Sequence, residues 1–137
     1  MERLEFLVVD DMDMLRDMAK IGVLRSYPGY EVNVDTANDG TDMVRLATEK
    51  RYNGIISDIN MTAMDGLTAV ENLRIAGVTT KVLIYASKPT HENLQRMDKL
   101  GLPYIEKPSP LAIFAAKLHE IWPEYAPRPK EAGPTGN

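Results

Sequence analysis

Four charged side chains follow short apolar runs, at positions where a buried strand would end. Asp10 and Asp11 follow the run LVV, Asp58 follows GIIS and Lys107 follows YIE. Carboxylates that converge at one edge of a sheet repel one another unless a cation lies between them. Mg²⁺ is a hard divalent ion that binds carboxylate, carbonyl and water oxygens. These residue types therefore predict a magnesium site, with Lys107 left to face a dianionic phosphoryl group.

Each of these features also has a simpler structural explanation. A pair of aspartates after a strand is more often a turn and a helix N-cap than a metal site. Asp58 could cap the loop that follows it, and Lys107 could be a solvated lysine ahead of a proline that starts a helix. Asp65-Gly66 is turn and N-cap chemistry in either interpretation. The magnesium site is favoured because all the charged features fall at the ends of expected strands.

Apolar runs alternate with segments of helical spacing along the chain, which predicts an α/β fold. The expected strands cover about 4–9, 30–37, 53–58, 81–86 and 102–106. The expected helices cover about 13–25, the stretch around 43–47 after a turn at 38–40, 67–75, 90–100 and 110–121. This alternation predicts a parallel sheet covered on both faces and, with right-handed crossovers, a doubly wound layout. In such folds ligands bind beyond the carboxyl ends of the strands, where the four charged residues fall.

Composition limits the function classes. The chain has 137 residues, no cysteine and a net charge of -4, so disulfides are excluded and direct nucleic-acid binding is not expected. Charge comes too early for a signal peptide and no apolar run approaches membrane-spanning length, so we expect a cytoplasmic protein without a membrane segment. Residues 1–122 would form one domain, and the Pro- and Gly-rich residues 123–137 a disordered tail or linker.

Four motifs resemble those of the receiver domains of two-component response regulators in order and spacing: LVVDD (7–11), NDG (38–40), DINMTAMDG (58–66) and YIEKP (104–108). The resemblance covers about residues 4–121. It implies a flavodoxin-like (βα)5 fold with a five-stranded sheet in the order 2-1-3-4-5. It also implies a cis peptide bond between Lys107 and Pro108.

The resemblance implies a signalling switch rather than an enzyme that acts on other molecules. Asp58 would accept a phosphoryl group from a histidine kinase or a phosphotransfer protein and form an acyl phosphate. Asp11, Asp58 and the backbone carbonyl of Asn60 would bind Mg²⁺ directly, Asp10 would act mainly through water, and Lys107 would pair with the phosphoryl group. The added charge would change contacts with a downstream protein. We expect a monomer or weak dimer.

The sequence departs from the family pattern at two places. Thr62 stands where a proline is usual. The fourth strand usually ends in a serine or threonine that binds the phosphoryl group, whereas counting along this strand places Ala86 there and Ser87 one residue later. A shift of one residue turns a side chain to the opposite face, so we favour Ala86 in register, although a bend could bring Ser87 in. Tyr104 matches the switch aromatic of the family, or is a half-buried tyrosine of an edge strand.

The first helix begins with a cluster of apolar residues: Met12, Met14, Leu15 and Met18. Leu15 and Met18 are expected to face the core and the others solvent. The resemblance implies kinase docking on this helix, where adaptable methionines would suit an interface, and output through the fourth helix, fifth strand and fifth helix. Trp122 and Tyr125 would extend the output surface or anchor the tail. His91 and His119 are expected to face solvent, and Asn60 and Lys88 match positions that tune phosphoryl hydrolysis in the family.

Two other classes of function stay open. A pseudo-receiver would bind its partner constitutively and would never be phosphorylated; Ala86 favours this, and the acidic residues with Lys107 argue against it. A phosphatase of the haloacid dehalogenase type would use the spacing Asp11-Met12-Asp13 as its D-x-D motif. That class would not use Asp58 as its acceptor.

Overall fold

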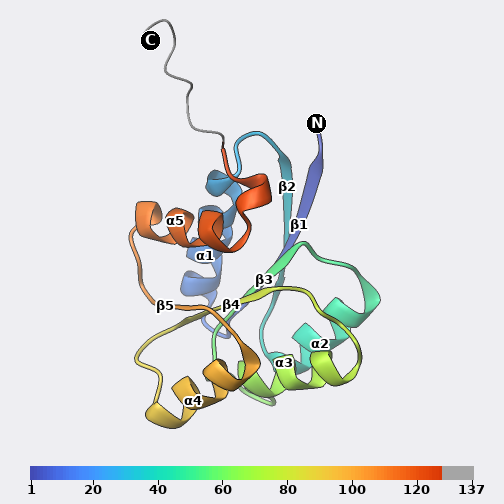
Figure 1. The fold of residues 1–137 in the computed structure, drawn as a ribbon, viewed down its shortest axis with the longest axis vertical. Coiled ribbons are helices and arrows are strands. Elements are labelled where there is room, and N and C mark those ends of the chain that lie inside the picture. The colour runs from blue at the N-terminus through green and yellow to red at the C-terminus, as the bar shows by residue number, and fades with distance from the viewer. Residues whose placement is uncertain (128–137) are drawn as a thin grey trace, which may run out of the picture.

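The computed structural model describes residues 1–127, in which strands and helices alternate (Figure 1). The strands are β1 (Arg3–Val9), β2 (Glu31–Ala37), β3 (Gly54–Ser57), β4 (Val82–Ala86) and β5 (Tyr104–Glu106). The helices are α1 (Asp13–Ser26), α2 (Gly40–Glu49), α3 (Gly66–Ile75), α4 (His91–Leu100) and α5 (Leu111–Ile121), followed by the 3-10 turn η1 (Pro123–Tyr125). No helix among the described residues is long and apolar enough to cross a membrane.

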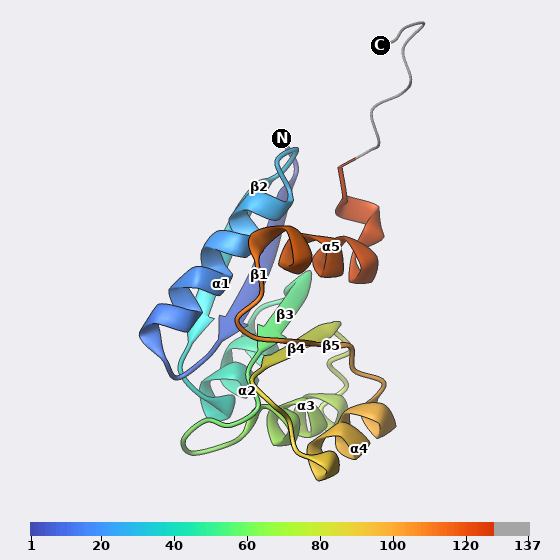
Figure 2. The same cartoon turned by 90° about the vertical axis from the view of Figure 1, so that its left-hand side faces the viewer.

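The five strands form one parallel sheet in the order β2-β1-β3-β4-β5, which confirms the predicted fold class. Strand β1 pairs with β2 on one side, where Phe6 lies opposite Val34, and with the central strand β3 on the other, where Phe6 lies opposite Gly54. Parallel pairing brings all the carboxyl ends to one edge of the sheet. Figure 2 shows the arrowheads of β1 and β2 at this edge, beside the start of α1.

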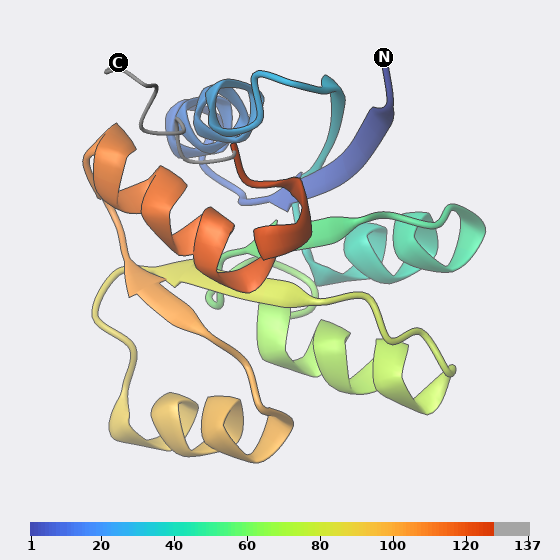
Figure 3. The ribbon, with the colours of Figure 1, turned by 45° about the horizontal axis from the view of Figure 1, so that its top comes forward.

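Helices cover both faces of the sheet: α1 and α5 lie on one face, and α2, α3 and α4 on the other (Figure 3). The alternation of side chains along each strand explains this arrangement. In β1, Phe6 and Val8 join the core beneath α1 and α5, while Leu7 and Val9 join the core above α2, α3 and α4. Both faces of the strand are therefore apolar, as expected for a parallel sheet.

Side-chain caps fix the starts of two helices, α2 and α3, that follow the carboxyl edge of the sheet. The Asp39 carboxylate accepts a hydrogen bond from the Asp42 amide at the start of α2, and the Asp65 carboxylate accepts one from the Thr68 amide at the start of α3. The predicted N-cap role of Asp65 is confirmed, and the predicted turn at 38–40 also supplies an N-cap, Asp39. Such caps end the loops beyond β2 and β3 at defined points.

The prediction that Met18 packs in the core is wrong. Its residue is 50% exposed, whereas the buried face of α1 consists of Ala19, Gly22, Val23 and Ser26. The reason is the close approach of α5: a Cβ atom at Gly22 would lie 2.7 Å from the Phe114 ring, so small residues set the inward face. Leu15 is half-buried, and Met12 and Met14 are exposed as expected.

At the end of α5, Trp122 and Tyr125 were expected either to extend the output surface or to anchor the tail. Trp122 is buried, with its ring edge-on to Phe6, so it belongs to the core and not to an exposed surface. The η1 turn packs beyond it: the Tyr125 hydroxyl accepts a hydrogen bond from the Asn53 side chain at 3.1 Å. The packed part of the chain thus extends past residue 122, and residues 128–137 of the predicted tail lie outside the described residues.

The two histidines have different surroundings. His91 is exposed, as predicted. His119 is half-buried, with its Nε2 atom 2.6 Å from the Ser26 carbonyl oxygen and its ring edge-on to Tyr27, so the prediction that it faces solvent is wrong. The sequence does not show that His119 is half-buried, because its contacts with Ser26 and Tyr27 depend on how α1 and α5 pack together.

Candidate functional site

The four predicted charged residues meet at the carboxyl edge of the sheet. The Lys107 ammonium, just after β5, donates to Asp10 Oδ2 at 2.6 Å and to Asp58 Oδ2 at 2.9 Å. The strands deliver these groups because β1, β3 and β5 are parallel and their ends fall at one edge. The peptide bond between Lys107 and Pro108 is cis, which confirms the expectation.

This cluster is buried. The side chains of Lys107, Asp10 and Asp58 expose only 4%, 5% and 11% of their surface. Burial raises the pKa of the Asp58 carboxyl above its ordinary value, although the hydrogen bond from Lys107 opposes the shift. Burial would lower the pKa of Lys107, but its hydrogen bonds to Asp10 and Asp58 outweigh burial and raise it. Lys107 is therefore held protonated against two carboxylates.

The three aspartates fit a hard divalent cation. Carboxylate oxygens of Asp10, Asp11 and Asp58 all lie within 4.8 Å of one another. Asp10 Oδ1 accepts from the Met12 amide and Asp58 Oδ1 from the Ile59 amide. The Asp11 carboxylate is exposed and accepts no hydrogen bond from any residue that the structure describes, so its lone pairs are available. An all-oxygen donor set with one open, acidic side matches the preference of Mg²⁺.

The loop after β3 carries Asn60, which lies exposed two residues beyond Asp58. Its carbonyl remains a predicted metal ligand. The loop closes on itself, because the Gly66 amide donates to the Ile59 carbonyl at 2.8 Å. A Cβ atom at Gly66 would lie 2.0 Å from the Asp58 carbonyl oxygen, so only glycine allows the helix to start this close to the acceptor. Within the loop, Ala63 has a φ of 64°, a left-handed conformation.

The predicted switch residues lie at the ends of β4 and β5. Ala86 is the last residue of β4 and is buried, and Ser87 beyond it donates its hydroxyl to the Lys107 carbonyl at 3.4 Å. Tyr104 begins the edge strand β5 and is half-buried. Lys88 is exposed. The switching and tuning roles of these residues stay predictions.

Two polar residues lie near the site without having been predicted there: Arg16, and Asn38 of the NDG motif. The Arg16 guanidinium donates to the Asp10 carbonyl at 3.1 Å and to the Asn38 side-chain oxygen at 2.7 Å. Asn38 directly follows β2, so the end of the predicted second strand could have placed it at the same edge. Arg16 lies inside a helix, and spacing alone does not show where its long side chain reaches.

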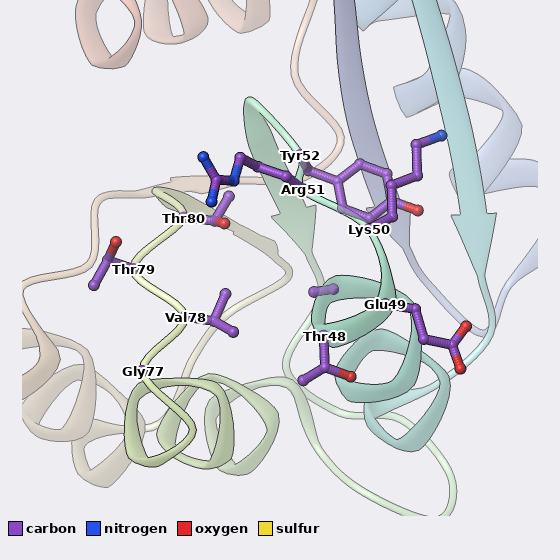
Figure 4. A pocket seen from close by; sticks show the side chains of 10 residues that line it. Thr48, Glu49, Lys50, Arg51, Tyr52, Gly77, Val78, Thr79 and Thr80 are labelled. Carbon is purple, nitrogen blue, oxygen red and sulfur yellow. The ribbon is translucent and has the colours of Figure 1, made fainter.

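A large cavity among the described residues lies elsewhere. A space of about 610 Å³ separates residues 47–52 from residues 77–80 (Figure 4). These segments lead into β3 and β4, so the cavity is at the amino edge of the sheet, opposite the charged cluster. In Figure 4 the Arg51 side chain extends toward Thr80, while Glu49 and Lys50 point away from Thr79. None of the predicted site residues lines it.

Comparison with known proteins decides the family. The model of the response regulator receiver domain matches residues 6–119. The chain belongs to this family. Receiver domains are typically signalling modules rather than enzymes, and they partner with histidine kinases. The haloacid dehalogenase alternative is not supported, because the whole matched segment is a receiver.

Among curated relatives, this receiver is 37% identical over 101 residues to a protein-glutamate methylesterase/protein-glutamine glutaminase of Caldanaerobacter subterraneus, covering 74% of the chain and 27% of the relative. It is 32% identical over 116 residues to the transcriptional regulatory protein PrrA of Mycobacterium leprae, covering 84% of the chain and 48% of the relative. The chain thus spans less than half the length of either relative.

Solved structures agree with the fold. The chemotaxis protein CheY4 of Vibrio cholerae is 28% identical, with a TM-score of 0.74, and the match covers 87% of this chain and 98% of that one. A CheY-like receiver domain protein of Methanospirillum hungatei has a TM-score of 0.77 at 22% identity, covering 90% and 97% of the two chains, and shows likeness of fold alone.

Proposed function

We propose that this receiver is a phosphorylation-dependent switch in which Asp58 accepts the phosphoryl group. The observation that carries the proposal is the buried cluster in which Lys107 contacts both Asp10 and Asp58 within reach of Asp11. A structural ion pair would not need a third carboxylate left open beside it. An acceptor site needs a nucleophilic carboxylate, a cation for the incoming oxygens and ligands for a metal.

The chemistry is an in-line transfer. A carboxylate oxygen of Asp58 attacks phosphorus in a phosphohistidine or a small phosphodonor, forming an acyl phosphate. The bond from phosphorus to the donor breaks, and a histidine donor leaves as imidazole that takes a proton. Lys107 already lies 2.9 Å from Asp58 Oδ2, so its ammonium can pair with the phosphoryl oxygens as they arrive. Positioning and charge supply most of the rate.

Magnesium would be held by the carboxylates of Asp11 and Asp58 and the carbonyl of Asn60, with Asp10 acting mainly through water. When bound, it neutralises charge on the phosphoryl oxygens. The residues of this chain meet its needs, because the donors are oxygens only and Lys107 occupies one side of Asp10 and Asp58 while Asp11 stays open.

The phosphodonor partner would dock on α1. Five large apolar side chains are exposed on this helix or at its start: Met12, Met14, Met18, Ile21 and Leu24. Exposed apolar groups on neighbouring turns mark protein contact sites. The helix begins directly after Asp10 and Asp11, so a kinase or phosphotransfer protein bound there would present its phosphohistidine near Asp58. A downstream protein would read the phosphorylated state through α4, β5 and α5.

The test is covalent labelling. Incubating the protein with acetyl phosphate and Mg²⁺ should add one phosphoryl group, seen as a shift in intact mass. The variant Asp58→Asn should show no adduct. The matched control is Asp17→Asn, which removes an exposed carboxylate from α1 and should label like the wild type. An adduct that persists in Asp58→Asn would contradict the assignment of the acceptor.

The second candidate is a phosphorylation-independent protein-binding module. The observation that favours it is Ala86, which offers no hydroxyl to a phosphoryl group. A charge-assisted hydrogen bond, worth about 1.5 to 3 kcal/mol, would then be missing from the phosphorylated state. A wild type that gains no mass from acetyl phosphate would favour this module. An adduct on Asp58 would favour the switch.

A further inference from the structure

The guanidinium of Arg16 lies between two loops at the functional edge of the sheet. Its Nη1 atom donates both to the backbone carbonyl of Asp10, at 3.1 Å, and to the side-chain oxygen of Asn38, at 2.7 Å. Its Nη2 atom donates to Asp13 at 2.7 Å. The side chain exposes only 15% of its surface. Arg16 therefore links the loop after β1 with the loop after β2.

The loop after β1 carries two of the three aspartates, and apart from the Lys107 ammonium on Asp10 Oδ2 its remaining contacts are few. The Asp10 amide donates to the Ala37 carbonyl, and Asp10 Oδ1 accepts from the Met12 amide. Asp11 itself is exposed and takes part in no side-chain hydrogen bond with the described residues. Its position thus depends on how firmly Asp10 and Met12 are held on either side. Arg16 supplies the bond to the Asp10 carbonyl, next to Asp11.

Through Asn38 the same contact is also connected to the far end of the loop that follows the third aspartate. Two residues beyond Asn38, the Gly40 amide donates to the Met64 carbonyl at 2.9 Å, in the loop that follows Asp58. A Cβ atom at Gly40 would lie 2.5 Å from that carbonyl oxygen, so the two loops are in close contact. Hydrogen bonds therefore run from Arg16 through the loop after β2 to the loop after β3.

Helix stability does not explain this arginine. A cation near the start of a helix is disfavoured by the helix dipole. The partner Asp13 is 87% exposed, and exposed ion pairs contribute little. The charge of Arg16 also does not help the acidic site bind metal, because a nearby cation repels Mg²⁺. The contacts that remain are those that fix the loops.

We propose that Arg16 is a positioning residue for the acidic site: its fork of donors holds the Asp10 carbonyl and Asn38 so that Asp10, Asp11 and Asp58 keep the spacing that binds a divalent ion. The inference rests on the proposed function, in which these carboxylates hold Mg²⁺. It adds a role for a residue outside the acidic set, acting through backbone and loop contacts.

The test measures Mg²⁺ affinity by calorimetry, without a phosphodonor. In Arg16→Ala the affinity should fall about 10-fold, in the range found when residues that orient metal ligands are removed. The sign is diagnostic, because losing a cation would by charge alone tighten binding. Arg16→Lys keeps the charge but lacks the fork, so it should weaken binding similarly. Asn38→Ala should weaken binding by a smaller factor. Arg25→Ala, which removes an exposed cation from the same helix, is the matched control and should bind like the wild type.

Phosphorylation by acetyl phosphate gives a second measurement. Arg16→Ala should need about 10-fold more Mg²⁺ for half-maximal labelling of Asp58 but reach the wild-type rate at saturation. Thermal unfolding identifies variants that fail to fold. If Arg16→Ala is among them, Mg²⁺ affinity is compared for Arg16→Lys or Asn38→Ala instead. Unchanged or tighter Mg²⁺ binding in a folded Arg16 variant overturns the inference, as does a wild type that binds no Mg²⁺. If the wild type is labelled and Arg16→Ala binds Mg²⁺ with unchanged affinity, only this inference is overturned. If the wild type is not labelled but Arg16→Ala binds Mg²⁺ more weakly, only the phosphorylation proposal is overturned.

Discussion

Two lysines of this receiver each lie between two carboxylates, yet the two clusters differ in what they can do. Lys107 contacts Asp10 and Asp58 at 2.6 and 2.9 Å. Lys50, at the end of α2, contacts Glu5 of β1 and Asp35 of β2 at 2.9 and 2.8 Å. Residue types and distances are nearly the same. The difference must come from the surroundings.

The carboxylates around Lys50 are partly solvated and have neutral donors as well. The side chains of Glu5 and Asp35 expose 20% and 33% of their surface. Asn33 donates to both, and the Tyr52 hydroxyl donates to Asp35 at 2.7 Å. The hydrogen bond from Lys50 lowers the pKa of Asp35. Burial would raise the pKa of Glu5, but its bonds to Lys50 and Asn33 outweigh burial and lower it.

The Lys107 cluster has the opposite balance. Asp58 is more deeply buried, its pKa is raised by burial, and Asp11 beside it is left without a donor among the described residues. A satisfied cluster with lowered acid pKa values stabilises the fold. A cluster with an unsatisfied carboxylate and a raised acid pKa carries unfavourable negative charge that a bound cation can neutralise. Surroundings, not residue types, separate the structural cluster from the functional one.

The largest expected effect comes from removing each lysine. Lys107→Met leaves Asp10 and Asp58 buried without their cation, so the free energy of unfolding should fall by about 3 kcal/mol. Lys50→Met removes a partly exposed partner and should cost less than about 1 kcal/mol. Urea unfolding in metal-free buffer measures both. Added Mg²⁺ should restore stability to Lys107→Met and not to Lys50→Met. Equal losses in the two variants would remove the distinction between the clusters.

The sequence predicted the functional cluster better than the structural one, for a physical reason. Asp10, Asp58 and Lys107 follow three strands, and parallel pairing brings strand ends together whatever the detailed register. Glu5 meets Lys50 and Asn33 only because β1 and β2 pair with Glu5 opposite Asn33, and no local pattern sets that register. Arg16 was missed for a similar reason, since its reach depends on the placement of a neighbouring loop.

The remaining errors concern the packing between α1 and α5. Met18 and Val23 are both apolar residues of α1, but only Val23 is buried. The choice is made by Phe114 lying against Gly22, a contact between residues 92 positions apart in sequence, 114 minus 22. His119 and Trp122 find their surroundings in the same interface. Helical spacing predicts that a helix forms, but the neighbouring elements fix its rotation and so decide which of its residues face the core.

A second comparison neutralises one acid in each cluster and should change stability in opposite directions. Asp58→Asn removes a buried carboxylate whose raised pKa makes ionisation unfavourable in the fold, so stability at neutral pH should rise without Mg²⁺. Asp35→Asn removes a satisfied ion pair and should lower stability by up to about 1 kcal/mol. Urea unfolding of both variants checks the signs. A loss of stability in Asp58→Asn would show that Lys107 fully compensates the buried carboxylate.

The smallest expected effect is in the pH dependence of the stability changes caused by Asp58→Asn and Asp35→Asn. A lowered folded-state pKa, as for Asp35, gives stability that is present above the unfolded value of 3.8 and is lost as the pH falls through the folded value below it. The raised pKa of Asp58 has the opposite sign: its cost is present above the folded value and vanishes as the pH falls toward the unfolded value of 3.8.

The gap in stability between wild type and Asp58→Asn should therefore start to close at a higher pH than the gap between wild type and Asp35→Asn. Thermal unfolding in metal-free buffers from about pH 7 to about pH 3 measures both gaps, across the range in which carboxylates titrate. The exposed Asp17→Asn serves as the control, and its small difference from the wild type should not vary in this way. If both gaps closed together below pH 3.8, burial would not be what distinguishes Asp58 from Asp35. If they close in the expected order, Asp58 is the carboxylate whose ionised form is destabilised by burial in the fold.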